Sequence, residues 1–525
     1  MTDITDRVPH DAPGIREIGF HVPDRYNASS ILFNNLAAGR ADKAAVVTEA
    51  ETWRYGELCA LACRIGNGLL SLGLKRGDRV ILVLNDHPDY AAAIFGAMRA
   101  GLVPVLINTL SPADVVAYFL EDSGATVALI HEEHRALFSD AVPRHLIALD
   151  GDDGLGWISD QPTDLEEADT HRDDMAFWMY SSGSTGRPKG VVHLHHDMAY
   201  SVESYARRVL DIQPDDVCFS VPKIFFAYGF GNSLTFPFAM GATSALLPDR
   251  PTPKRIFDVI AKCRPTQFFA LPTVYTALIK SEDVDAADLS SVRRCISAAE
   301  VLSGDVFNAW KDRFGHEIVE GLGSTEVLHI YLSNTDAKKK LGSAGMRVPG
   351  YEIKLTDRDG NPTPLGEEGI MWVRGDSSAP CYWNRPDKTA ETMRDGWIWT
   401  GDRFIADEDG FYFFRGRADD LIKVSGQWVY PLEVELCLNE HPKVLECAVM
   451  GLQMDDGRTT LAAVIAPARG ALGDDALSDE LRAYVKQTLL PYKYPRQILY
   501  METLPKTGTD KIDRQACKRA LTGAV

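Results

Sequence analysis

The stretch YSSGSTGRPKG, from Tyr180 to Gly190, combines small and hydroxylated residues with a single lysine. A loop of this composition exposes backbone N–H groups and hydroxyls, which suit phosphate oxygens. It follows the apolar run AFWMY, so we interpret it as a loop that leaves a strand. It is not a Walker A loop, because Pro188 precedes Lys189 where that motif requires glycine. The stretch therefore predicts a site for the phosphates of a nucleotide.

Four further motifs follow in order: GLGSTE (321–326), WTGD (399–402), FRGRADDLIKVSGQWVYPLEVE (414–435) and LPKTGTDKIDR (504–514). Together with the loop they resemble the signatures of the adenylate-forming superfamily, which includes acyl-CoA synthetases, luciferases and peptide-synthetase adenylation domains. Five matches in one order across most of the chain make the resemblance specific. It implies that a carboxylic acid and ATP form an acyl-AMP and pyrophosphate, after which the acyl group passes to an acceptor.

The resemblance assigns a role to each motif. It implies that Thr185 cradles the β- and γ-phosphates, that Glu326 and Thr185 hold Mg²⁺, and that Asp402 accepts the ribose hydroxyls with Arg417 beside it. A lone carboxylate such as Glu326 suits a hard cation. SAAE (297–300) resembles the segment that packs on adenine, where many relatives carry glycine in place of Ala299. The implied cofactor-binding residues are Ser181, Ser182, Gly183, Ser184, Thr185, Gly186, Lys189, Ala299, Glu300, Gly321, Leu322, Gly323, Ser324, Thr325, Asp402, Arg417, Gly426 and Lys493.

Lys511, in the last motif, is the residue expected to carry the chemistry. Attack of a carboxylate on the α-phosphorus builds negative charge on oxygen, and a positioned cation stabilises that charge. Asp510 stands where the family usually has glycine, and Lys506 is a nearby rival for the role.

The acid is indicated by VPKIFFAYGFGNSLTFPF (221–238) and GLGSTEVLHIYLSN (321–334). These stretches resemble bacterial benzoate-CoA ligases and their relatives that act on hydroxybenzoate, aminobenzoate or furoate. The implied ring pocket is Ala227, Tyr228, Gly323, His329 and Ile330, with Lys423 near the carboxylate. A flat apolar acid fits such a slot. A medium-chain or alicyclic acid-CoA ligase is the alternative within the superfamily, and a non-catalytic nucleotide-binding regulatory relative is the alternative outside enzymes.

The acceptor expected from this resemblance is coenzyme A, since no carrier domain follows residue 525. Relatives swing a small C-terminal domain about a hinge, here Asp419, between the two half-reactions. Gly426 would then line the pantetheine tunnel, where a glycine permits a close backbone approach. Lys493 is read either as a contact of CoA phosphates or as a surface lysine.

The elements that must position these residues alternate. Amphipathic helices such as LCALACRIGNGLLSLGL and short apolar strands such as RVILVL and ATVALI predict α/β lobes with parallel sheets. From about residue 342, short strands with Gly and Asp turns predict a small β-rich lobe. The expected organisation is an N-terminal arm (1–26), a large adenylate-forming domain (27–418) and a mobile C-terminal α+β domain (419–525) with the catalytic lysine.

The net charge of −19 argues against nucleic acid as a partner. Nine scattered cysteines fit a reducing cytoplasm. HLHH (193–196) invites a metal-site interpretation, but we expect it to be the end of a strand that enters a helix. The first 25 residues do not read as a signal peptide and no apolar run reaches membrane-spanning length, so we expect a cytoplasmic enzyme without a membrane partner. A homodimer is left open.

Overall fold

The computed structural model describes residues 13–150, 154–181, 187–418, 422–424, 427–453, 459–468, 470–490, 492–506 and 512–523. The chain forms two compact units. One comprises Met1–Lys354 and Trp372–Thr400, and the other comprises Leu355–Met371 and Gly401–Val525. The predicted boundary residue Asp419 lies outside the described residues, so the boundary there stays a prediction. Within the predicted arm, Pro13–Ile18 forms helix α1.

The first unit contains a six-stranded sheet that carries the predicted phosphate loop. Neighbouring strands are parallel up to the last pair, which is antiparallel. The strand order is β6 (His145–Ala148), β5 (Val127–Ile130), β3 (Arg79–Val83), β4 (Val103–Leu106), β7 (Met175–Ser181) and β8 (Lys189–Leu194). The apolar runs RVILVL and ATVALI are therefore buried parallel strands, as their composition predicts.

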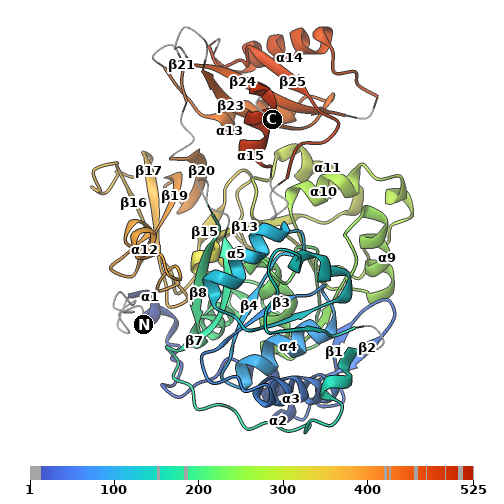
Figure 1. Ribbon diagram of the computed structural model, residues 1–525. Coiled ribbons are helices and arrows are strands. Elements are labelled where there is room, and N and C mark those ends of the chain that lie inside the picture. The colour runs from blue at the N-terminus through green and yellow to red at the C-terminus, as the bar shows by residue number, and fades with distance from the viewer. Residues whose placement is uncertain are drawn as a thin grey trace. The chain divides into compact units, whose positions relative to one another are not determined.

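Helices α3 (Tyr55–Ser71) and α4 (Pro88–Arg99) lie side by side near this sheet (Figure 1). Glycines stand where the two helices meet. A Cβ at Gly66 would lie 2.7 Å from the carbonyl oxygen of Gly96, and a Cβ at Gly96 would lie 2.3 Å from that of Ala62. Larger residues there would separate the helices and open the core that they share with the sheet.

A second sheet in the first unit holds the GLGSTE motif. Its strands β12 (Arg294–Ser297) and β13 (Ile318–Gly323) run parallel, and β14 (Ile330–Ser333) returns antiparallel to β13. Helices α9 (Pro253–Cys263), α10 (Pro272–Ile279) and α11 (Gly304–Phe314) supply part of its core, in which Trp310 packs edge-on against Tyr275 at 4.7 Å between ring centroids. The strands in order are β15 (Gly345–Arg347), β14, β13, β12, β11 (Gln267–Ala270), β9 (Val217–Ser220), β10 (Thr243–Ala245), β1 (Ala44–Val47) and β2 (Thr52–Arg54).

The predicted β-rich stretch is also present. It consists of short strands, with helix α12 (Pro386–Thr392) among them. The strands are β16 (Glu352–Thr356), β17 (Glu368–Arg374), β18 (Met393–Arg394), β19 (Trp397–Ala406) and β20 (Phe411–Arg417).

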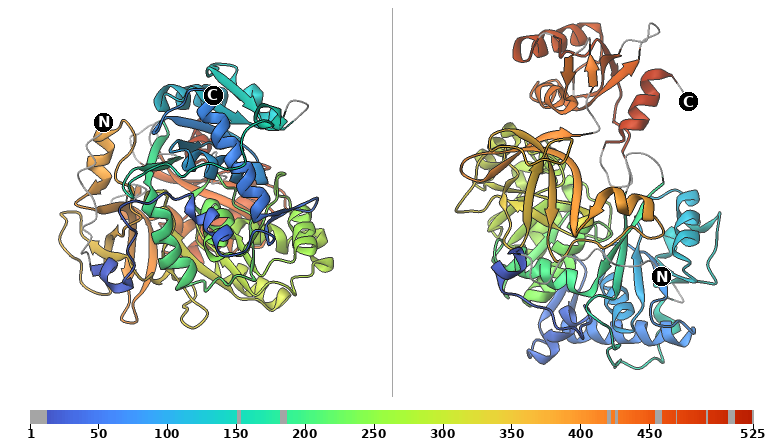
Figure 2. Two further views of the ribbon diagram at one scale, coloured as in Figure 1. Left: turned by 90° about the horizontal axis from the view of Figure 1, so that it is seen from below. Right: turned by 90° about the vertical axis from the view of Figure 1, so that its left-hand side faces the viewer.

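The C-terminal part of the second unit is a three-stranded sheet of β23 (Val444–Gln453), β24 (Thr459–Pro467) and β25 (Gln497–Tyr500). Successive residues of β23 face opposite sides. Val449 packs with α13 (Pro431–Asn439) and α14 (Asp475–Thr488), whereas Met450 packs with α15 (Arg514–Thr522) on the other face. The right-hand view of Figure 2 shows α15, the last helix of the chain, on the opposite side of this sheet from the other two helices. The predicted α/β and α+β fold class is confirmed. In the described part of the chain, no helix combines the length and apolar character that a membrane span requires.

Candidate active site

The ends of the predicted phosphate loop lie opposite each other. Ser181 ends β7 and pairs with Lys189, which begins β8 in the antiparallel ladder. The loop is thus the connection of a hairpin whose two ends are fixed by strand pairing. Its central residues, Ser182, Gly183, Ser184, Thr185 and Gly186, lie outside the described residues, and their phosphate contacts stay predictions.

Tyr382 joins Lys189 to Glu326. The Lys189 ammonium lies 4.1 Å from the centroid of the Tyr382 ring, and the Tyr382 hydroxyl donates a hydrogen bond of 2.9 Å to Oε1 of Glu326. Burial lowers the pKa of Lys189, and the nearby Glu326 carboxylate partly opposes that shift. Tyr382 was missed in the sequence, because one tyrosine in the run CYWNRP has no spacing that marks it. The structure brings two of the predicted ATP-site residues together through it.

We expect Tyr382→Phe to raise the KM for ATP roughly three- to tenfold, with kcat changed less, because Glu326 loses one charge-assisted hydrogen bond while the ring under Lys189 remains. Acid-dependent ATP–pyrophosphate exchange measures both constants. Tyr55→Phe is the matched control, since Tyr55 is a buried tyrosine whose hydroxyl donates to the carbonyl of Ala242. An unchanged KM for ATP in Tyr382→Phe would show that the hydroxyl does not position Glu326.

The backbone around Glu326 is strained. Glu326 lies in the short 3₁₀ turn Thr325–Val327, and the next residue, Leu328, has φ 69° and ψ −43°. A buried leucine rarely adopts this γ-turn conformation, and such strain is concentrated at functional sites. Just before the turn, a Cβ at Gly323 would lie 2.4 Å from the carbonyl oxygen of His329. Gly323 is therefore required for β14 to return this close to β13. Gly321, Leu322, Ser324 and Thr325 lie on the same stretch.

The predicted adenine segment follows β12. Ala299 adopts φ 73°, the left-handed region that favours glycine. Alanine there costs about 1 kcal/mol relative to glycine, so the departure at this position carries strain. Glu300 accepts a 3.2 Å hydrogen bond from the backbone N–H of Thr273. Glu320, which was not singled out in the sequence, accepts a bond from the N–H of Leu302, and burial raises the pKa of Glu320 to about 8.

The predicted ribose residues lie together in the second unit. Asp402 on β19 is the direct ladder partner of Arg417 on β20, and Nη1 of Arg417 lies 3.2 Å from Oδ1 of Asp402. Strand pairing alone therefore orients the carboxylate and the guanidinium toward each other.

The predicted ring pocket is assembled from two segments. Ala227 begins helix α7 (Ala227–Phe230), and the Tyr228 ring lies 5.6 Å from that of His329. Gly323 pairs with Ile330 across β13 and β14. Burial lowers the pKa of His329 to about 3, so its imidazole is neutral at pH 7. His329 therefore offers a polar edge or an apolar face to a substrate, but not a cation to a carboxylate.

The remaining predicted residues belong to the C-terminal segment. Lys423 lies in β21 (Ile422–Val424), where its backbone pairs with that of Trp428 in β22 (Gln427–Val429). Lys493 is buried and ion-paired with Glu433. Asp419, Gly426, Asp510 and Lys511 lie outside the described residues, and their roles stay predictions.

Comparison with known proteins places this geometry in a family. The model of the AMP-binding enzyme family matches residues 33–383, and that of the AMP-binding enzyme C-terminal domain matches residues 433–511. The chain belongs to the AMP-binding enzymes. The resemblance to adenylate-forming enzymes near the benzoate-CoA ligases is confirmed.

Individual relatives narrow the class further. The chain is 42% identical to the benzoate–CoA ligase of Thauera aromatica, over 94% of this chain and 96% of that protein. It is 40% identical to the 4-hydroxybenzoate–CoA/benzoate–CoA ligase of Rhodopseudomonas palustris, over 95% of each. The crystal structure of an anthranilate CoA ligase in complex with anthranoyl-AMP superposes with a TM-score of 0.91 at 35% identity, covering 96% of this chain and 99% of that one. These findings confirm the predicted enzyme class, an AMP-forming acid–thiol ligase that uses ATP and CoA.

Proposed function

We propose that the chain is an aryl-CoA ligase that activates benzoate or a hydroxy- or amino-substituted benzoate. The observation that carries this choice is the half-buried Tyr228 ring packed beside the buried His329 next to Gly323, an aromatic wall that suits a flat ring. The relatives named for benzoate and 4-hydroxybenzoate support the same class of acid. The confirmed enzyme class removes the non-catalytic alternative and leaves a medium-chain or alicyclic acid as the competitor.

The reaction runs in two steps. A carboxylate oxygen of the acid forms a bond to the α-phosphorus of ATP, and the bond to pyrophosphate breaks. The CoA sulfur, as thiolate, then bonds to the acyl carbon, and AMP leaves with the electron pair of the broken C–O bond. Both steps shift negative charge onto oxygen, so the protein's contribution is to position cations and donors in advance.

The predicted ATP-site residues would serve the first step. The ribose of ATP would bind Asp402 and Arg417, and Lys189 supplies a positive charge at the end of the phosphate loop. The carboxylate of Glu326, oriented by Tyr382, is a hard oxygen donor that fits Mg²⁺, with Thr185 as the second ligand. When bound, Mg²⁺ would neutralise charge on the phosphates. The neutral His329 would contact the ring, which leaves the acid carboxylate to Lys423.

The second step would use another pose of the C-terminal segment. A swing about Asp419 would remove Lys511 from the reacting phosphate and bring Gly426 to the acyl-AMP. Lys493, already paired with Glu433, would reach a CoA phosphate only by giving up that ion pair.

Acid-dependent ATP–pyrophosphate exchange tests the proposal without CoA. Benzoate is expected to support exchange, and hexanoate and cyclohexanecarboxylate are expected to support at least about tenfold less, since they lack the flat ring that this slot suits. Exchange that hexanoate supports as well as benzoate would contradict the assignment of the ring pocket.

A further inference from the structure

The segment HLHH (193–196) is not explained by the reaction, yet its first histidine contacts the ATP-site turn. His193 is fully buried at the end of β8 and stacks on Phe177 at 5.1 Å between ring centroids. Its Nε2 lies 2.8 Å from the carbonyl oxygen of Thr325, and its Nδ1 lies 2.8 Å from Oδ2 of Asp197. The Thr325 carbonyl can only accept, so Nε2 donates to it, while Nδ1 faces the Asp197 carboxylate.

Asp197 is itself held in place. Its Oδ2 also accepts a 3.0 Å hydrogen bond from the backbone N–H of Leu194, which caps helix α6 (His195–Ser201). Its Oδ1 lies 3.3 Å from Nδ1 of His196, whose Nε2 lies 3.4 Å from Oδ1 of Asp173. The carboxylate that orients His193 is thus fixed by a helix start, and the imidazole of His196 lies close to it.

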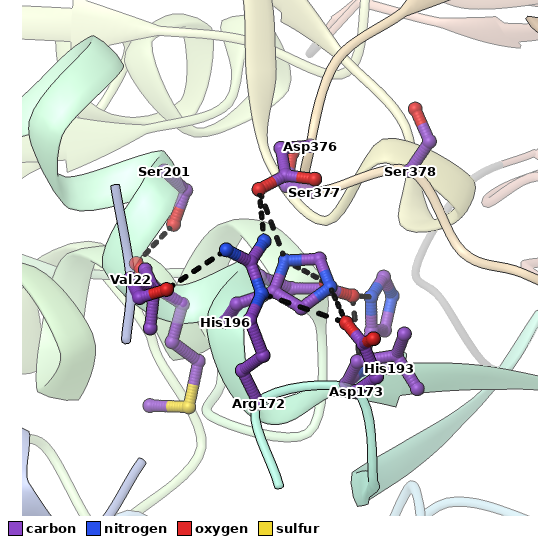
Figure 3. A network of polar contacts seen from close by, with 12 residues as sticks. Val22, Arg172, Asp173, His193, His196, Ser201, Asp376, Ser377 and Ser378 are labelled. Atoms are coloured by element: carbon purple, nitrogen blue, oxygen red, sulfur yellow. Dashed lines mark hydrogen bonds and ion pairs between the residues drawn. The ribbon is translucent and has the colours of Figure 1, made fainter. Parts of the chain in front are cut away.

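The polar network around Asp197 and His196 extends to the other side of the turn Thr325–Val327. Arg172 is buried and donates 2.6 Å from Nη2 to Oδ2 of Asp376, and Nη1 donates 2.9 Å to the carbonyl of Val22 (Figure 3). Asp376 also lies 3.5 Å from Nδ1 of His196. Arg172 therefore fixes the start of the segment 376–379, with His196 nearby.

Segment 376–379 contacts the turn directly after Thr325. The Ser377 hydroxyl donates 2.9 Å to the carbonyl of Val327, and the N–H of Ala379 donates 2.7 Å to the carbonyl of Glu326. With the His193 bond, three consecutive carbonyls, those of Thr325, Glu326 and Val327, are held by side-chain or backbone donors. This fixes the backbone that carries the Glu326 carboxylate.

We propose that His193, held by Asp197, is a positioning residue of the ATP site: its bond to the Thr325 carbonyl fixes the turn that presents Glu326. This inference rests on the ATP half of the proposed function and not on the choice of acid. Supporting residues that lock a ligand-binding group commonly change affinity when they are removed.

The test compares Mg–ATP binding, by calorimetry without acid, in four variants of the full chain. His193→Phe keeps a flat ring on Phe177 but removes the imidazole contacts with the Thr325 carbonyl and Asp197, which then keep the backbone N–H groups of Leu328 and Leu194 as donors. His193→Gln restores an amide donor toward Thr325. Asp197→Asn keeps an acceptor for Leu194 and removes the charge. His195→Phe is the matched control, because His195 is an equally buried histidine whose Nδ1 accepts from the N–H of Ala28 instead.

The dissociation constant for Mg–ATP should rise about tenfold in His193→Phe, about threefold in Asp197→Asn and less than about threefold in His193→Gln. His195→Phe should lower the melting temperature and leave the constant unchanged. An unchanged constant in His193→Phe, or an equal rise in His195→Phe, would overturn the proposal. If His193→Phe does not fold, a dissociation constant for Mg–ATP in Asp197→Asn equal to that of the wild type would overturn the proposal instead. Because the binding test contains no carboxylic acid substrate, its result does not depend on whether the proposed aryl acid is correct.

Discussion

Lys511→Ala is expected to lose aryl-AMP formation by roughly 10²–10³-fold, equivalent to about 3–4 kcal/mol, while it still converts supplied aryl-AMP and CoA to the thioester within a few-fold of wild type. The lysine is proposed to stabilise the charge that develops when the acid attacks the α-phosphorus. The thioester step is proposed to use a different face of the C-terminal segment. Pyrophosphate exchange measures the first half-reaction, and AMP release from supplied aryl-AMP measures the second.

Lys506→Ala is the control for that result. Lys506 is the rival lysine of the same motif, and its ammonium forms an ion pair with Glu446. That pairing engages its charge within the C-terminal segment, so we expect Lys506→Ala to keep exchange within about threefold. Equal loss of both half-reactions in Lys511→Ala would count against the two-pose scheme, and loss of exchange in Lys506→Ala would transfer the catalytic role to Lys506.

Glu326→Gln is expected to lower kcat/KM for ATP on the order of 10²-fold, because the amide cannot supply the negative oxygen ligand that Mg²⁺ prefers. The amide oxygen can still accept the bond from Tyr382, so the turn should keep its structure. Exchange rates measured over a Mg²⁺ titration should show weaker Mg²⁺ binding than in the wild type. A higher Mg²⁺ concentration should partly restore the exchange rate.

Glu317→Gln provides the matched comparison. Glu317 directly precedes β13, the strand that leads to the ATP-site turn, and it pairs with Lys311 at the surface. We expect its loss to leave kcat/KM for ATP within about twofold. A Glu326→Gln variant with wild-type Mg²⁺ dependence would exclude Glu326 as a metal ligand.

The sequence predicts the parts of the site that depend on local order. Apolar runs at residues 79–83 and 127–130 are buried parallel strands, as composition alone indicates. The pairing of Asp402 with Arg417 follows from two neighbouring strands and a short turn. The interpretation of HLHH as a strand that enters a helix is also confirmed, since β8 ends at Leu194 and α6 begins at His195.

Contacts between distant segments could not be predicted in this way. Tyr382 lies 56 residues from Glu326, and His193 lies 132 residues from Thr325. No local pattern encodes such pairs, because the fold of the whole first unit brings them together. The neutral state of His329 could not be predicted either, since it depends on burial among three rings from two distant segments rather than on neighbouring residues.

Ala299 shows how the structure changes the meaning of a small departure. In the sequence, alanine for glycine adds one methyl group. In the structure, the backbone at φ 73° makes that methyl group a source of strain within the predicted adenine segment. Only the dihedral angle distinguishes a neutral exchange from a strained one.

The most direct test of the aryl-CoA ligase assignment is AMP release by the purified protein with ATP, Mg²⁺ and CoA across a panel of acids. The panel contains benzoate, its 2-, 3- and 4-hydroxy and amino forms, 2-furoate, cyclohexanecarboxylate and hexanoate. The account predicts that one or more of the aromatic acids will be preferred at least about tenfold over both non-aromatic acids, cyclohexanecarboxylate and hexanoate. Preference for hexanoate, or no turnover with any aromatic acid, would contradict it.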